Sequence, residues 1–314
     1  SLVGSEMCIR DSYKGHLNKN NVLLTQGVDA VCIFVNDIAD AEVLRIMASN
    51  GVKLLALRCA GFNNVDLNAA AAAGITVVRV PAYSPYAVAE YTVALMLSLN
   101  RKIPRASWRT KDGNFSLHGL MGFDMHGKTA GIIGTGKIAK ILIHILKGFG
   151  MNILAYDLYP DYNFAREEKI VYTSLDELYH SSDIISLHCP LTEATKYLIN
   201  DYSISKMKDG VMIINTGRGQ LIHTNALIEG LKNKKIGSAG LDVYEEESEY
   251  FYEDQSDRII DDDVLARLLS FNNVIVTSHQ AFFTHEALEN IAMTTLQNIR
   301  DFINHKPLLN EVKK

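Results

Sequence analysis

The sequence lacks the long apolar runs and the excess of basic residues that mark two large classes of protein. No apolar run approaches the roughly 18 residues that suggest a membrane-spanning helix. Acidic residues outnumber basic ones, 36 against 31, and the formal net charge is −5. This charge provides no electrostatic basis for binding nucleic acid or an anionic membrane. We therefore expect neither partner.

Cysteine is also scarce and scattered. The chain has four cysteines and no CxxC pair: Cys8, Cys32, Cys59 and Cys189. This spacing speaks against a disulfide framework or a zinc site, so we expect no metal and a reducing, cytoplasmic location. The start, SLVGSEMCIRDS, has no initiator methionine and none of the features of a signal peptide.

Short apolar runs alternate with helix-like segments along the 314 residues, a length that suits two domains. This alternation predicts parallel sheets with helices on both faces. The expected strands are Ala30–Val35, Val52–Leu57, Ile75–Val80, 183–189, 211–217, 237–243 and 273–279. The strand that precedes Gly134 starts a second series of strands and helices.

Several helix signals lie between these strands. Ser84 and Pro85 have the residue types of an N-cap and a first helical residue, and they begin a long apolar helix. The polar, glycine-containing stretch 101–125 suggests a crossing between domains. SLDE, Ser174 to Glu177, has the pattern of a capping box. A helical pattern returns from Thr284 to about Asn304.

The stretch GIIGTGKIAK follows a strand and opens a helix. Gly134 and Gly136 would let the backbone turn tightly and approach a pyrophosphate, whose charge the helix N-terminus favours. The next strand ends at Asp157, about 20 residues on, where an acid binds the ribose 2′-hydroxyl. A 2′-phosphate would be repelled there, so NAD is predicted over NADP. The alternative for Asp157 is a simple strand-end cap.

Arg218, Glu247 and His279 each lie at or just after the carboxyl end of a predicted strand. In doubly wound sheets, ligands bind outside the carboxyl ends of the strands. Singly, each has a plain alternative: a loop cation, part of the charged run EEESEY, or a loop histidine. Together they fit one chemistry. An arginine grips a carboxylate, a histidine gives a proton to a carbonyl oxygen, and a carboxylate keeps that histidine protonated. We interpret Gly217 and Gly219 as leaving room for substrate and nicotinamide.

The chain resembles the D-isomer-specific 2-hydroxyacid dehydrogenases, and most closely the bacterial fermentative D-lactate dehydrogenases. The resemblance covers roughly Leu17 to Asn310. It rests on the stretches LRCAGFNNVD, VPAYSP, GKTAGIIGTGKIA, KGFGMNILAYD, DIISLHCPLT, NTGRG, LDVYEEE and TSHQAFFT.

The resemblance implies an α/β fold of two doubly wound domains. An NAD-binding Rossmann domain, expected at 102–280, is inserted into a discontinuous flavodoxin-like substrate domain, expected at 1–101 and 281–314. It implies a catalytic set of Arg218 as carboxylate clamp, His279 as acid/base and Glu247 as its partner. The implied cofactor contacts are Gly134, Gly136, Lys137, Ile138, Asp157, Cys189, Pro190, Thr216, Gly217, Arg218 and Asp242. The implied substrate contacts are Phe34, Ala60, Gly61, Tyr83, Arg218 and Phe282.

Three departures from the family pattern stand out. Tyr91 replaces the histidine of the family's AEH, which we interpret as structural. Thr195 stands where relatives often carry an asparagine near the cofactor. The family's first βα unit has no counterpart, since SLVGSEMCIRDS does not match it. We hypothesise a 5′-truncated fragment with a spurious leader.

The expected function is NADH-dependent reduction of pyruvate to D-lactate by a homo-oligomer, a dimer or tetramer. Within the same class, hydroxyisocaproate and glyoxylate or hydroxypyruvate are alternative substrates. An NAD-sensing corepressor-like binding protein is the alternative from another class.

Overall fold

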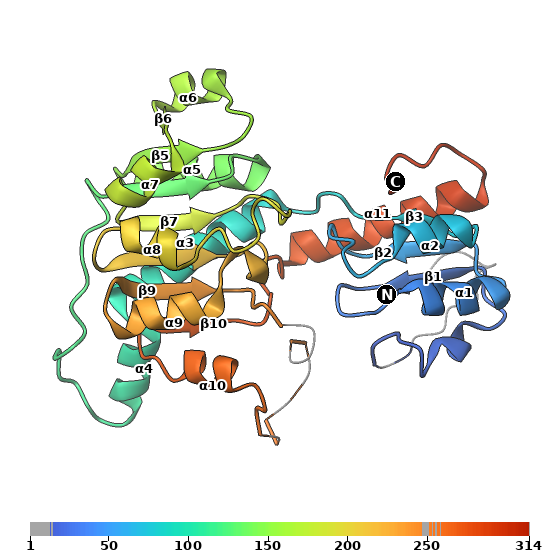
Figure 1. Ribbon diagram of the computed structural model, residues 1–314, viewed down its shortest axis with the longest axis horizontal. Coiled ribbons are helices and arrows are strands. Elements are labelled where there is room, and N and C mark those ends of the chain that lie inside the picture. The colour runs from blue at the N-terminus through green and yellow to red at the C-terminus, as the bar shows by residue number, and fades with distance from the viewer. Residues whose placement is uncertain are drawn as a thin grey trace. The chain divides into compact units, whose positions relative to one another are not determined.

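The computed structural model describes residues 13, 15–246, 251, 252, 254, 256, 257 and 259–313. The chain divides into two compact units, Ser1–Tyr83 with His285–Lys314 and Ser84–Thr284 (Figure 1). The leader SLVGSEMCIRDS and Glu247 lie outside the described residues.

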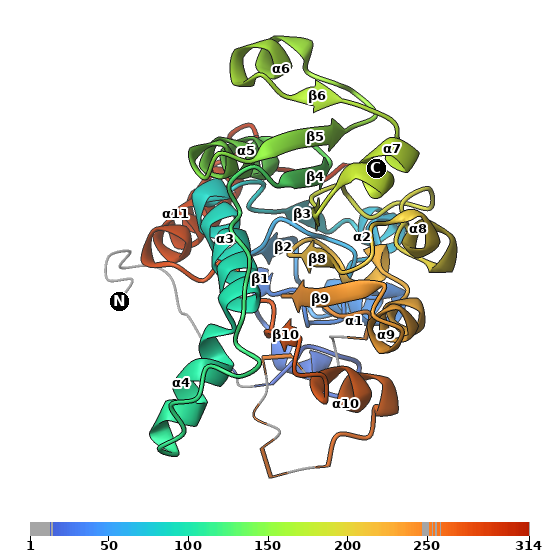
Figure 2. The same cartoon turned by 90° about the vertical axis from the view of Figure 1, so that its left-hand side faces the viewer.

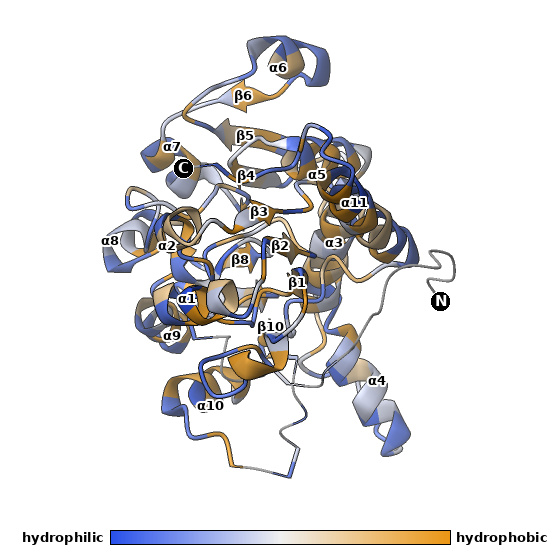
Figure 3. Ribbon diagram, turned by 90° about the vertical axis from the view of Figure 1, so that its right-hand side faces the viewer, coloured by the Kyte–Doolittle hydropathy of each residue, from blue (hydrophilic) through white to orange (hydrophobic). Residues whose placement is uncertain are grey.

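The unit formed by both chain ends contains, among its described residues, a parallel sheet in the order β1-β2-β3. Its elements are η1 (Val22–Thr25), β1 (Ala30–Ile33), α1 (Ala41–Ser49), β2 (Leu54–Leu57), α2 (Leu67–Ala72), β3 (Thr76–Val78) and α11 (His285–Ile303). Figure 3 shows α11 on one side of this sheet and α1 and α2 on the other. Leu54, Ala56 and Val78 are buried and pack against Ile299 and Phe302 of α11. The predicted strands and the C-terminal helix are confirmed.

The unit Ser84–Thr284 contains, among its described residues, a parallel sheet in the order β10-β9-β8-β7-β4-β5-β6. These strands are β4 (Thr129–Ile133), β5 (Asn152–Tyr156), β6 (Val171–Tyr172), β7 (Ile184–Leu187), β8 (Val211–Asn215), β9 (Ile236–Leu241) and β10 (Val274–Val276). The order reverses between β4 and β7. This arrangement is the doubly wound topology, with its crevice at the carboxyl ends of the strands.

Helices cover both faces of this sheet (Figure 2). They are α3 (Pro85–Arg101), α4 (Ile103–Lys111), α5 (Lys137–Gly148), α6 (Tyr162–Glu168), α7 (Leu175–Ser181), α8 (Asp201–Lys206), α9 (Thr224–Lys232) and α10 (Asp263–Leu269), with the short turn η2 (Gly219–Leu221). One apolar cluster packs α3 and α5 on the strands, and a second packs α7, α8 and α9 on the opposite face. The central strands are therefore buried on both faces, as the continuous apolar runs predicted.

The long helix α3 belongs to the unit Ser84–Thr284, and not to the substrate domain 1–101 that was expected to contain it. Its buried residues, including Met96 and Leu99, share a cluster with Leu142 of α5 and Ile214 of β8. The unit therefore begins at Ser84 and ends at Thr284, and these boundaries differ from the predicted 102 and 280. Apolar content alone did not indicate which sheet the helix would cover.

Two local expectations also differ from the structure. Part of the stretch 101–125 is helical, since it contains α4, and it lies within one unit. Ser174 caps α7 by accepting from the Glu177 amide, but Glu177 accepts from the Ser181 hydroxyl, so only half of the predicted capping box forms. Within the described residues, no helix has the length and apolar character to cross a membrane.

Candidate active site

The glycine-rich turn links β4 to α5. Gly134 has φ +89°, and a Cβ there would lie 2.5 Å from the backbone nitrogen of Cys189. Gly134 is therefore glycine for its left-handed conformation and for its close approach to the end of β7. Gly136 differs, because a Cβ there would meet no atom within 4 Å. The backbone at Gly136, just before Lys137 and Ile138 of α5, is open to an approaching ligand, as a bound pyrophosphate requires.

Asp157 joins the turn after β5 to the glycine-rich turn. Its carboxylate accepts from the Thr135 amide at 2.6 Å, the Thr135 hydroxyl at 2.9 Å and the Tyr159 amide at 2.9 Å. Burial works to raise the pKa of Asp157, but the hydrogen bonds from Tyr159 and Thr135 outweigh it and hold the pKa below its ordinary value. Asp157 is therefore ionised, with about one of its four acceptor positions left for a ligand hydroxyl.

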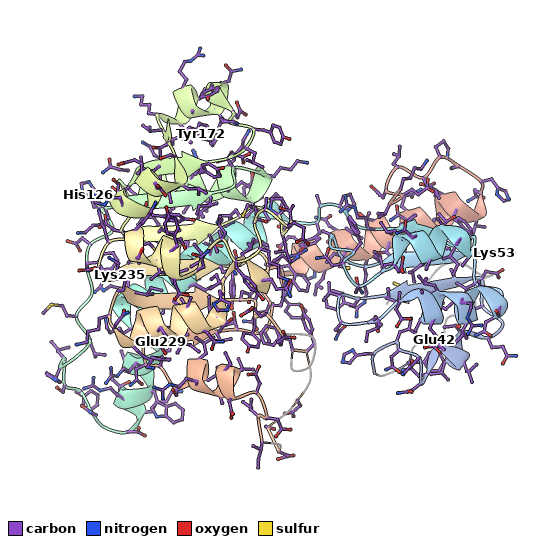
Figure 4. All side chains as sticks on the ribbon, in the orientation of Figure 1. Glu42, Lys53, His126, Tyr172, Glu229 and Lys235 are labelled. Carbon is purple, nitrogen blue, oxygen red and sulfur yellow. The ribbon has the colours of Figure 1, made fainter. Side chains whose placement is uncertain are left out.

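Tyr172 extends this network from the strand next to β5. Its phenol donates to the Thr135 hydroxyl at 2.8 Å, and Figure 4 labels its side chain on β6. The network Tyr172, Thr135, Asp157 fixes the acid beside the glycine-rich turn. The residues present fit an adenine dinucleotide, with Gly136 open and Asp157 ionised. Thr135 is not among the predicted cofactor contacts, although its place between two glycines is a signal for such a role.

Cys189 and Pro190 follow β7, as predicted. Burial raises the pKa of the Cys189 thiol to about 11, so the side chain is a neutral wall and not a nucleophile. Thr195 donates through its hydroxyl to the Pro190 carbonyl at 2.7 Å, so it closes its own turn. His188 lies between β7 and this wall. Burial lowers its pKa to about 4, and its Nε2 is 2.8 Å from the Ser186 hydroxyl.

Arg218 lies at the turn after β8. The Asn215 side chain holds this turn, since it accepts from the Gly217 amide at 3.0 Å and donates to the Arg218 carbonyl at 2.9 Å. The Arg218 guanidinium donates to the Gly217 carbonyl at 2.7 Å and remains partly exposed. Nearby, the hydroxyl of Thr216 is 3.0 Å from that of Thr92 on α3. Strand β8 therefore positions the Arg218 cation at the carboxyl edge of the sheet.

The two glycines that flank Arg218 have different reasons for being glycine. A Cβ at Gly219 would lie 2.0 Å from the Tyr244 carbonyl oxygen, so this glycine permits a close backbone approach. A Cβ at Gly217 would meet only ordinary contacts, at 3.5 Å and beyond. The interpretation that both glycines clear room for ligands is therefore wrong for Gly219, where protein backbone occupies the space.

Asp242 follows β9, the strand beside β8, and His279 follows β10, the next strand in the sheet. The His279 amide donates to the Asp242 carbonyl at 2.7 Å. The buried Asp242 carboxylate accepts from the Thr277 hydroxyl at 2.6 Å, the Gln280 amide at 2.9 Å and the Ala281 amide at 2.8 Å. Burial raises the pKa of Asp242, although these hydrogen bonds oppose the rise. Asp242 thus anchors the loop that carries His279, and its predicted contact with the nicotinamide stays a prediction.

The structure places Arg218 and His279, the two described members of the predicted catalytic set, at one edge of one sheet. All strands of this sheet are parallel, and β8 and β10 flank β9. Their carboxyl ends therefore meet at the same edge. A permanent cation and an imidazole at that edge can bind an anion and move a proton.

The predicted substrate contacts come from both units. In the unit of the chain ends, Arg58 stacks over the Phe34 ring at 4.2 Å, and the Asn290 side chain donates to the Tyr83 carbonyl at 2.7 Å. Within the described residues, the amides of Ala60 and Gly61 donate to no hydrogen-bond acceptor, so they can serve a substrate carboxylate.

Phe282 belongs to the other unit, where its ring packs edge-on against Phe283.

Comparison with known proteins identifies the class. Residues 93–281 match the family model "D-isomer specific 2-hydroxyacid dehydrogenase, NAD binding domain". The chain belongs to this family of dehydrogenases, and its cofactor is NAD. A "2-hydroxyacid dehydrogenase homolog" of Haemophilus influenzae is 56% identical over 90% of this chain and 85% of the relative.

A D-lactate dehydrogenase of Escherichia coli is 52% identical over 97% of this chain and 94% of its own length. Two solved structures are similarly related. The apo-structure of D-lactate dehydrogenase from Escherichia coli has a TM-score of 0.87 and 50% identity, covering 96% of this chain and 91% of that one. The pyruvate reductase of Chlamydomonas reinhardtii has a TM-score of 0.90 and 48% identity, with 95% and 90% covered.

Proposed function

We propose that the protein is an NAD-dependent D-lactate dehydrogenase that interconverts pyruvate and D-lactate. The observation that carries the proposal is the position of Arg218 after β8 and of His279 after β10, the two strands that flank β9, at the edge that also holds the glycine-rich turn. Relatives of about half-identical sequence bear the names D-lactate dehydrogenase and pyruvate reductase, and they support this choice of substrate.

The residues divide the reaction between them. The Arg218 guanidinium binds the substrate carboxylate with two parallel hydrogen bonds and faces the carbonyl oxygen. His279 donates its proton to that oxygen as the carbon is reduced, and takes the proton back in the reverse direction. NADH, when bound, supplies the hydride. Glu247, outside the described residues, is proposed to favour the protonated form of His279.

The cofactor would lie against the open backbone at Gly136, with the ionised Asp157 accepting from a ribose hydroxyl. Asp157 would repel a 2′-phosphate, which supports NAD over NADP. The remaining predicted contacts would form the walls of this site. They are Lys137, Ile138, Cys189, Pro190, Thr216, Gly217 and Asp242 on the cofactor side, and Phe34, Ala60, Gly61, Tyr83 and Phe282 on the substrate side.

A panel of 2-oxo acids tests the choice of substrate. NADH oxidation is measured with pyruvate, 2-oxoisocaproate, glyoxylate and hydroxypyruvate, and the lactate formed is analysed on a chiral column. The proposal predicts the highest kcat/KM with pyruvate and D-lactate as the product. Preference for 2-oxoisocaproate would favour the second candidate, since a D-2-hydroxyisocaproate dehydrogenase structure is 32% identical with a TM-score of 0.82. NADH binding without turnover of any acid would favour the corepressor-like alternative.

We further propose that the protein works as a homo-oligomer in the cytoplasm. The helix α4 has no buried residue, and Trp108 on it is 69% exposed. Exposed apolar residues continue after it at Phe115, Leu117 and Met121. A second copy of the chain is an occupant for this surface, because large exposed apolar patches mark interaction sites.

Sedimentation velocity of the parent and of a Trp108→Glu variant tests the oligomer. A dimer or tetramer that dissociates in the variant, and not in the control Tyr202→Glu, is expected. A monomeric parent would contradict it. Cell fractionation tests the compartment, and recovery outside the cytoplasmic fraction would contradict that part of the proposal.

A further inference from the structure

Tyr91, the residue that departs from the family's histidine, contacts the loop that carries His279. Its phenol oxygen accepts a hydrogen bond of 2.8 Å from Nε2 of Gln280. Gln280 is the residue directly after His279. From the sequence alone, this departure is interpreted as structural. The structure shows that the Tyr91 hydroxyl is hydrogen-bonded to the residue next to the proposed acid/base.

His279 is held in an unusual backbone conformation. Its φ is +52°, in the left-handed region that residues other than glycine occupy only where their surroundings hold them there. On one side, Asp242 fixes the loop, through its carbonyl to the His279 amide and through its carboxylate to the Gln280 amide. On the other side, Tyr91 fixes the Gln280 side chain. Gln280 is thus restrained at its backbone from β9 and at its side chain from α3.

The hydrogen bond crosses a region where α3 and the loop are not closely packed. A hollow of about 350 Å³ lies between them. It is lined by Ala87, Glu90, Tyr91 and Ala94 of α3 and by Gln280, Ala281, Phe283 and Thr284. Apolar packing therefore fixes the distance between the two segments only loosely there, and a directed bond between Tyr91 and Gln280 sets it more closely.

The two segments are also where the chain enters and leaves this unit. The unit begins at Ser84, one residue before α3, and ends at Thr284, five residues after His279. A bond between Tyr91 and Gln280 couples these two crossings to each other. Any movement of α3 at its first turns is then passed to the loop.

We propose that Tyr91 is a positioning residue for the reaction, acting through Gln280 to set the orientation of His279. The inference rests on the proposed dehydrogenase function. It is particular to a tyrosine at this position, because the phenol oxygen lies farther from the backbone than either nitrogen of an imidazole. A misplaced acid/base slows proton transfer without weakening cofactor binding.

A double-mutant cycle tests the inference. The variants are Tyr91→Phe, which removes only the hydroxyl, Gln280→Met, which keeps length but removes the amide, and their combination. Tyr86→Phe, the same change at an exposed position of α3, is the control. NADH titration first counts the cofactor-competent sites, so that kcat is expressed per competent site and a folding defect is separated from a positioning defect.

Each single variant is expected to lower kcat with pyruvate about three- to fivefold, with the Kd for NADH within twofold and the control unchanged. The double variant is expected to be no slower than the slower single variant, because both changes break one contact. Losses that multiply, or single variants with unchanged kcat, would overturn the role of Tyr91. A parent that binds NADH but reduces no 2-oxo acid would instead overturn the proposed function, and this inference with it.

Discussion

The phenol of Tyr252 donates a hydrogen bond of 3.0 Å to the backbone carbonyl of His279, and the two rings lie 6.2 Å apart at an angle of 31°. Tyr252 itself has φ +70°. Tyr252 lies in the segment after β9, so its contact with the His279 loop is separate from the contacts that Asp242 and Tyr91 make with that loop. The loop is thus restrained from three directions, as a site that must present one imidazole requires.

Tyr252→Phe is expected to lower kcat with pyruvate only about two- to threefold, because the ring contact remains. Tyr252→Ala is expected to lower it about tenfold or more, since both the hydrogen bond and the ring are lost. Steady-state kinetics with saturating NADH measure both. Equal activity of the alanine variant and the parent would show that Tyr252 does not support His279.

Gly217 and Gly219 provide a matched pair for separating folding from binding. Gly219→Ala places a Cβ against the Tyr244 carbonyl and is expected to lower the free energy of unfolding by about 1–3 kcal/mol or more. Gly217→Ala has room and is expected to change it by less than about 0.5 kcal/mol. Chemical denaturation without cofactor makes the comparison. Equal stability of the two variants would contradict the different reasons assigned to these glycines.

Asp157→Ala is expected to weaken NADH binding about tenfold or more and to reduce the preference for NADH over NADPH. The ionised carboxylate accepts from the ribose and repels a phosphate, and both effects are lost together. Fluorescence titration with each cofactor measures the change. Thr135→Val is the control, because it removes one hydrogen bond to Asp157 but keeps the charge. An unchanged cofactor preference in Asp157→Ala would remove this residue from the site.

His188 predicts a specific pH dependence of stability. Its pKa is lowered to about 4 in the folded chain, against about 6.5 when unfolded. The folded state therefore binds fewer protons between these values, and stability falls as pH decreases through this window. The loss from pH 7.5 to pH 5 is about 2 kcal/mol for this one group.

The variant His188→Gln keeps a partner for Ser186 but cannot titrate. The fall in its free energy of unfolding over the same pH range should therefore be smaller than that of the parent, and the difference between the two falls should be about 2 kcal/mol. Denaturation curves at the two pH values give both differences. Parallel behaviour of parent and variant would mean that His188 is protonated as easily in the folded chain as in water.

Much of the fold follows from periodicity and composition. Apolar runs such as 211–217 correspond to strands buried on both faces, and GIIGTGKIAK links a strand to a helix as predicted. The cofactor turn and the order of Arg218 and His279 along the sheet edge could be predicted from the sequence, because parallel strands place their carboxyl ends together. The assignment of α3 to its unit could not be predicted, because the sequence of an apolar helix does not show which of two sheets the helix covers.

The finer parts of the site depend on contacts between distant residues. Gly219 is glycine because of Tyr244, and Tyr91 matters because of Gln280, which is 189 residues away. Neither partner is visible from local spacing. The capping box at Ser174 shows the same limit, because Glu177 found a different partner in Ser181. The role of Glu247, which lies outside the described residues, stays a prediction.

The substitution Arg218→Lys tests the central claim most directly. Lysine keeps the positive charge but loses the planar, bidentate grip on a carboxylate. NADH oxidation with pyruvate is measured for the parent, for Arg218→Lys and for the exposed control Arg45→Lys, with the Kd for NADH determined alongside. The account predicts at least about a hundredfold loss of turnover in Arg218→Lys alone, with nearly unchanged NADH binding. Full turnover in that variant would contradict it.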